Sequence, residues 1–267
     1  MEIKKSITIG QYIPANSPIH HLDARMKLLS AIFFMVFVFL IENVWGYVIL
    51  LVFLLVLILL SKIPFRYFIN GLKPILMLIV FTVILQLFFT KSASKPLIDI
   101  YFIHVYREGL VAGLFIFLRL LILVFSSSIL TLTSSPMQLT TSLEFILKPF
   151  SYIGLPTSEI SMMMTIALRF IPTILEETDR LIKAQSARGA DFEKGSVLKR
   201  VNNLIPILIP LFVSSFRRAD DLAIAMESRC FQVGAPRTHL KIMRFQWFDY
   251  FSFSSFILFL SVISYFF

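Results

Sequence analysis

The stretch WGYVILLVFLLVLILL, residues 45–60, contains no charged side chain, and every residue in it except Gly46 is aliphatic or aromatic. About 20 such residues are needed for a helix to cross the hydrocarbon core of a bilayer. The stretch therefore predicts a short membrane-spanning helix in which Trp45 and Tyr47 act as anchors at the membrane–water interface.

Similar apolar runs lie on both sides of this stretch, at Leu28–Ile41, Pro74–Thr90, Gly109–Leu132 and Phe245–Phe267. Hydrophobic residues make up 57% of the 267-residue chain, which is more than a water-exposed surface accommodates. Glu42 and Asn43, between the first two runs, favour a tight turn over one very long helix. The sequence thus predicts an all-α integral membrane protein with about five transmembrane helices.

The basic residues indicate how these spans are oriented. Fourteen of the 25 Lys and Arg residues lie between Ser134 and Arg244, whereas the turn at Glu42 and Asn43 has none. Because basic loops stay in the cytoplasm, we expect the N-terminus and residues 134–244 inside and the C-terminus outside. Three basic residues in Lys91–Arg107 lie on the opposite side and weigh against this orientation. A basic cytoplasmic face fits lipid headgroups, and no aromatic–basic pattern indicates nucleic-acid binding.

Residues 134–244 are too long for a loop, and their pattern predicts a helical cytoplasmic or interfacial domain. We therefore divide the chain into residues 1–133 with an N-terminal segment and four spans, residues 134–244, and residues 245–267 with the last span. Within the middle domain, Ser134 or Ser135 is expected to cap a first helix with Pro136 in its first turn, ending near residue 154.

Two longer helices are expected to follow in this domain. The second begins with Thr157 or Ser158 as its cap and runs to residue 189, its first half apolar and its second half amphipathic. The third runs from about Val197 to Phe231 and is interrupted or kinked by Pro206 and Pro210.

The ends of these two helices resemble one another. At an offset of 41 residues, both read Asp-x-Leu-x-x-Ala-x-x-small-Arg-small, with Ala187-Arg188-Gly189 matching Ser228-Arg229-Cys230. One such arginine is explained by the macrodipole at a helix C-terminus. Two of them favour docking to a pair of similar sockets on a dimeric partner, because small neighbours admit the partner's backbone while the guanidinium binds a carboxylate or carbonyl.

Two segments resemble a known family. ALRFIPTILEETDRLIKAQSARGADF, residues 167–192, is similar to the signature of the transmembrane T component of energy-coupling factor (ECF) transporters, the EcfT/CbiQ family, and YIPANSPIHHLDARMKLL, residues 12–29, is similar to that family's opening segment. The resemblance implies a prokaryotic plasma-membrane subunit that joins two ABC-type ATPases, alike or different, to a substrate-binding membrane S component for a vitamin or metal ion. It also implies that ATP is bound by the ATPases and that this chain holds no cofactor.

The resemblance assigns roles to particular residues. Ala187-Arg188-Gly189 matches in full the first of two ATPase-docking motifs of the family, whereas Ser228-Arg229-Cys230 keeps only the arginine of the second. ATP binding would draw the ATPases together and move both helices as levers. Met162, Met163 and Met164 offer an adaptable apolar surface to a membrane partner, although ordinary packing also explains such a run.

Other function classes fit the sequence less well. Its four histidines, His20, His21, His104 and His239, form no ligand cluster, and no phosphate-binding loop is present, so we expect neither an enzyme nor a metal site. The best candidate, His20-His21 near Asp23, fits a solvated segment better. The stronger rival is a secondary transporter or channel with Arg119, beside Ser126–Ser128, in the pathway. Arg119 also fits a structural contact between helices.

Overall fold

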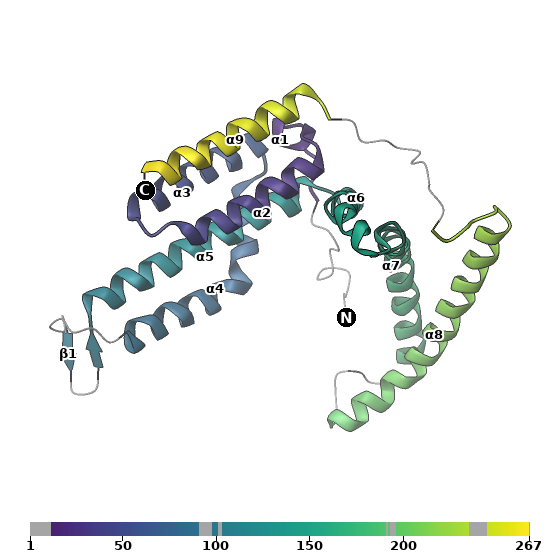
Figure 1. Cartoon of the computed structure of the whole chain (residues 1–267). Helices are drawn as coiled ribbons and strands as arrows, with labels where there is room; N and C mark the ends of the chain where they lie inside the picture. Colours follow the sequence, from purple (N-terminus) through teal and green to yellow (C-terminus); the bar gives the residue numbers. More distant parts are fainter. Residues whose placement is uncertain are drawn as a thin grey trace. The chain divides into compact units, whose positions relative to one another are not determined.

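The computed structural model describes residues 12–90, 98–100, 103–190, 192, 196–234 and 245–266. Its contacts divide the chain into two units (Figure 1), which we call the bundle, residues 10–142 and 242–267, and the inserted unit, residues 143–241. This division falls at residues 143 and 242, whereas we predicted domain boundaries at residues 134 and 245. Lys91, Lys95 and His239 lie outside the described residues.

The described part of the bundle contains five long helices and the short α1 (Pro18–His21). The long helices are α2 (Ala24–Leu40), α3 (Val44–Ser61), α4 (Phe65–Phe89), α5 (Arg107–Thr133) and α9 (Trp247–Phe266). Helix α5 packs against α2, α3 and α4, and α9 packs against α2. Each of the five predicted runs therefore forms a helix, and the all-α class is confirmed.

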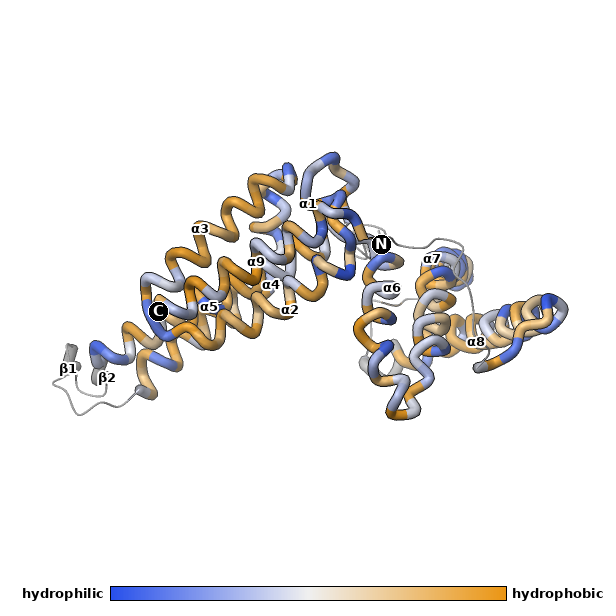
Figure 2. Tube along the Cα trace, turned by 45° about the horizontal axis from the view of Figure 1, so that its top comes forward, coloured by the Kyte–Doolittle hydropathy of each residue, from blue (hydrophilic) through white to orange (hydrophobic). Residues whose placement is uncertain are grey.

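Helix α3 shows why these residues belong in a membrane. Tyr47, Leu50 and Leu54 recur at helical spacing and are almost fully buried against neighbouring helices. The opposite face is equally apolar and yet exposed, as in Val52 and Leu59, which is 77% exposed. A helix that is apolar on all sides and has an exposed face is stable where that face meets lipid. Figure 2 shows hydrophobic residues, in orange, along much of the bundle helices.

In the described part of the chain, five helices are long and apolar enough to cross a membrane, but they are not quite the predicted five. Four belong to the bundle, namely α3, α4, α5 and α9. Helix α2 has only 17 residues and is not among the five candidate spans. The fifth candidate is instead α7 (Thr157–Ala187), whose first half is apolar. Length and composition establish a multi-pass membrane protein.

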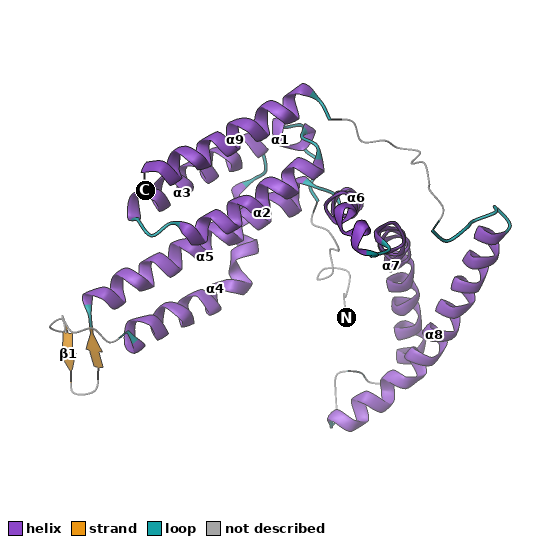
Figure 3. Ribbon diagram, in the orientation of Figure 1, coloured by secondary structure: helices purple, strands orange, loops and turns teal. Residues whose placement is uncertain are grey.

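Three details differ from the prediction. Helix α4 starts at Phe65 and continues through Pro74, the residue at which we expected the span to begin. An unpredicted antiparallel hairpin of β1 (Ile98–Ile100) and β2 (Ile103–Val105) joins α4 to α5, as Figure 3 shows in orange. The predicted cap of α7 is wrong because the helix already includes Thr157, and Pro156 occupies the cap position without a side-chain hydrogen bond.

Within the chain's middle part, the helices are α6 (Pro136–Leu147), the 3₁₀ helix η2 (Lys148–Ile153), α7 and α8 (Val197–Glu227). Ser135 caps α6 as predicted, since its Oγ accepts from Gln138 N while Gln138 Oε1 accepts from Ser135 N. Helix α8 continues through Pro206 and Pro210 without interruption and ends at Glu227, four residues before the predicted end.

Candidate functional site: two arginine-bearing helix ends

The first helix end, tip 1, is formed by Ala187, Arg188 and Gly189 at the end of α7. Gly189 N–H donates to Ser186 O at 3.0 Å, and Ala190 N–H donates to Gln185 O, also at 3.0 Å. This pair of hydrogen bonds is the Schellman motif, which needs a residue with positive φ after the C-cap. Gly189, with φ at +88°, supplies it, and Arg188 is the C-cap.

The second helix end, tip 2, is formed by Ser228, Arg229 and Cys230 after α8. Cys230 N–H donates to Glu227 O at 2.9 Å, and Phe231 N–H donates to Met226 O at 3.1 Å. Cys230 has a φ of +56°, which costs a side-chain-bearing residue about 1–2 kcal/mol. The loss of glycine from the motif therefore changes the side chain but keeps the backbone course of tip 1.

The arginine of each tip is exposed. Ala187, Arg188 and Gly189 are exposed, and so are the three residues of tip 2. Among the residues that the structure describes, neither guanidinium has a hydrogen-bond or ion-pair partner in this chain. A guanidinium offers five donors in a planar fork, which suits a carboxylate or backbone carbonyl of a second molecule.

The two tips are related by the crossing of α7 and α8. The helices run in opposite directions (Figure 1), and Gly234 N–H, just beyond tip 2, donates to Glu159 near the start of α7 at 3.0 Å. They meet at an ion pair between Glu177 and Arg218, 41 residues apart in the chain. This separation equals the offset between the tips, so the two arginines are the same number of residues from the ion pair along their helices.

The arms on both sides of the crossing are equal in length. Eleven residues separate Glu177 from Arg188, and eleven separate Arg218 from Arg229. At 1.5 Å rise per residue each tip lies about 17 Å along its helix from the crossing.

The predicted methionine surface is only partly present. Met163 is 56% exposed, whereas Met162 and Met164 are half-buried. A longer apolar stripe lies on α8, where seven exposed large side chains recur at four-residue spacing: Leu204, Ile205, Leu208, Ile209, Phe212, Val213 and Phe216. These residues fall in the apolar stretch Leu204–Phe216 of the predicted third helix.

Arg119 makes a structural contact. Its Nε donates to Tyr47 Oη at 3.0 Å, and this hydroxyl lies 3.1 Å from Ile41 O and 3.3 Å from Val38 O. Carbonyls at a helix C-terminus have no partner within the helix. Arg119 and Tyr47 thus satisfy the end of α2, and Arg119 does not line either of the two cavities found near Ser126–Ser128.

The side chains of His20 and His21 also contact nearby residues of their own segment. His20 Nδ1 lies 2.6 Å from Ser17 Oγ and its Nε2 lies 3.0 Å from Ile13 O, while His21 Nε2 lies 2.9 Å from Asn16 Oδ1. Burial lowers the pKa of His20. In the described part of the chain no three His, Cys, Asp or Glu side chains are grouped as a metal site would require.

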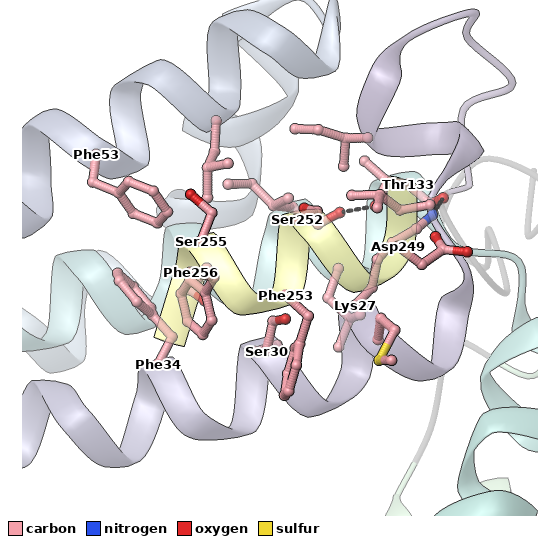
Figure 4. A pocket seen from close by; sticks show the side chains of 18 of the residues that line it. Lys27, Ser30, Phe34, Phe53, Thr133, Asp249, Ser252, Phe253, Ser255 and Phe256 are labelled. Atoms are coloured by element: carbon pink, nitrogen blue, oxygen red, sulfur yellow. Dashed lines mark hydrogen bonds between the residues drawn. The ribbon is translucent and has the colours of Figure 1, made fainter. Parts of the chain in front are cut away.

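A polar cluster that sequence analysis missed lies beside the larger cavity, of 420 Å³, between α2, α3, α5 and α9. Asp249 is buried and accepts hydrogen bonds from Asp23 N at 2.9 Å and Gln246 N at 2.8 Å. Lys27 Nζ donates to Thr133 O at 3.0 Å, a contact between α2 and the end of α5 (Figure 4). The sequence signal for this cluster was an acidic residue, Asp249, inside the last apolar run.

A family model described as cobalt transport protein, CbiQ, matches residues 15–240. The energy-coupling factor transporter transmembrane protein EcfT of Clostridium kluyveri is 51% identical over 240 residues, which cover 90% of this chain and 89% of that protein. The proteins of the same description from Thermosediminibacter oceani and Lactococcus lactis are 50% and 46% identical, covering 90% and 91% of both chains.

Proposed function

Because the chain belongs to the CbiQ family and is an ECF transporter transmembrane component, we propose that it couples ATP hydrolysis by two partner ATPases to movement of a substrate-binding membrane subunit. The proposal further places residues 134–244 in the cytoplasm, where ATP is available. The substrate is a vitamin or a metal ion bound by the partner, and this chain carries no catalytic group.

The observation that carries this proposal is the pair of matching tips. Two exposed arginines stand on the same backbone motif, each eleven positions beyond the Glu177–Arg218 ion pair that joins α7 to α8. Two equivalent ATPases related by a twofold axis would present two equivalent sockets. A carboxylate in each socket would form a charge-assisted, two-pronged hydrogen bond with one guanidinium.

The same helices provide a path for mechanical coupling. When ATP draws the ATPases together, the tips move with them and carry the stiff helices α7 and α8. The apolar stripe on α8, with Phe212 and Phe216 more than 60% exposed, offers a surface to a membrane partner at the other end of the path. Met163 extends such a surface onto α7.

Replacing both arginines tests the proposal. We expect Arg188→Glu or Arg229→Glu to weaken ATPase docking by about 2–5 kcal/mol, since each change leaves one socket with an unpaired charge and adds repulsion. One attachment remains in each single variant, so the complex persists while transport falls. The double variant loses the avidity of two linked contacts and releases the ATPases.

The measurements are pull-down of the ATPases and ATP-dependent uptake in proteoliposomes. Arg180→Glu is the matched control, because Arg180 is 81% exposed on α7 two turns before the tip. A double variant that keeps normal ATPase content and uptake would show that the arginines serve only their own helix ends.

A further inference from the structure

The ion pair at the crossing differs from an ordinary surface pair. Arg218 lies on the face of α8 that packs, in line with the half-buried Leu211, Leu222 and Met226, while its neighbour Arg217 is exposed. The side chains of Arg218 and Glu177 are only 32% and 27% exposed. Both charges have therefore lost much of their hydration, and each depends on the other for compensation.

A nearby pair on the same helix provides the contrast. Glu176 and Arg180 lie 3.7 Å apart within α7 and are 66% and 81% exposed. Exposed pairs of this kind add little to stability and constrain no second element. Glu177 and Arg218, in contrast, join two different helices.

We propose that Glu177 and Arg218 are positioning residues that fix the register of α7 against α8 and thereby the separation of the two tips. Apolar faces tolerate sliding of one helix along another, because one aliphatic contact replaces another. A charge pair allows only one register, since a shift by one turn of about 5.4 Å separates the charges. With equal arms of eleven residues, fixing the crossing fixes both tips at once.

The consequence for transport rests on the proposed function. The two sockets on an ATPase dimer move by a defined distance. If α7 could slide along α8 at their crossing, part of that movement would not be transmitted from one helix to the other. With the pair intact, displacement of tip 1 is transmitted to tip 2 and to the apolar stripe of α8. The pair therefore acts on coupling, whereas Arg188 and Arg229 act on attachment.

The tip separation can be measured directly in the purified full chain. Ala184 and Ala225 are both exposed alanines, seven residues beyond the crossing on their respective helices. We would replace both with spin-labelled cysteines in a Cys230→Ser background and record their distance distribution. We expect a narrow distribution in the parent, a broad or shifted one in Glu177→Arg and in Arg218→Glu, and recovery of the parental distance in Glu177→Arg/Arg218→Glu.

Glu176→Arg and Arg217→Glu are matched controls, because each makes the same charge change at the adjacent, exposed position. Both should leave the distance unchanged. The proposal is overturned if the single variants keep the parental distribution, or if the exchanged pair fails to restore it in a chain that purifies as well as the parent.

Uptake then separates this inference from the proposed function. Glu177→Arg should retain both ATPases in a pull-down but lower ATP-dependent uptake by about tenfold or more, with recovery on charge exchange. Uptake equal to the parent's in the single variants would contradict a role in coupling. If the arginine variants at the tips bind ATPases normally, the proposed function fails, while the distance measurement still decides whether the pair sets the register.

Discussion

Arg119 shows how one residue can be interpreted in two ways until its partners are known. In the sequence it is a lone charge deep in an apolar run, which is typical of a transport pathway. In the structure its guanidinium, through Tyr47, serves the carbonyls that end α2. A partner 72 residues away cannot be identified from local pattern, so the sequence alone left both interpretations open.

The hydrogen-bond chain predicts coupled losses of stability. Tyr47→Phe and Arg119→Met should each destabilise the bundle by about 1–3 kcal/mol, since each leaves polar groups without a partner. The double variant should lose little more than one single variant, because both changes break the same chain. Thermal unfolding in detergent measures this, and ATP-dependent uptake should persist in all three. Additive losses, or uptake abolished by Arg119→Met alone, would contradict the structural role.

At the scale of elements, the apolar runs located the bundle helices because each is apolar on every side. Boundaries were harder to predict, since the apolar run begins only at Pro74, after the charged Arg66 and Lys73, although α4 starts at Phe65 and includes all three residues. The register of α7 against α8 was harder still to predict. The offset of 41 residues was visible in the sequence, but the pairing of Glu177 with Arg218 also needs the opposite directions of α7 and α8.

Asp249 links the segment before α2 to the segment before α9 and should therefore contribute to the stability of the bundle. It accepts N–H groups from Asp23, just before α2, and from Gln246, just before α9. Asp249→Ala should lower stability by about 1–3 kcal/mol, because two part-buried N–H groups lose their acceptor. Asp249→Asn, which keeps one acceptor oxygen, should cost less. Thermal unfolding of both variants in detergent checks this order, and equal or negligible losses would contradict it.

For the whole molecule, the distribution of basic residues predicts the orientation in the membrane. In a Cys230→Ser background, a cysteine at Asn43 should react with an impermeant thiol reagent in intact cells, whereas one at Ala190 should react only after permeabilisation. Asn43 lies in the turn between α2 and α3, and Ala190 follows tip 1. The reverse pattern would place the tips outside the cell, away from ATP, and the coupling account would fail.

The most direct test of the central claim is whether both tips touch ATPase subunits in the assembled complex. A photo-crosslinker would be attached to the exposed native Cys230 at tip 2 or, in a Cys230→Ser background, to a cysteine at Ala190 beside tip 1, with Asn43→Cys as the control. We predict adducts with an ATPase subunit from both tips and none from Asn43. An intact, purified complex that gives no ATPase adduct from either tip would contradict the account.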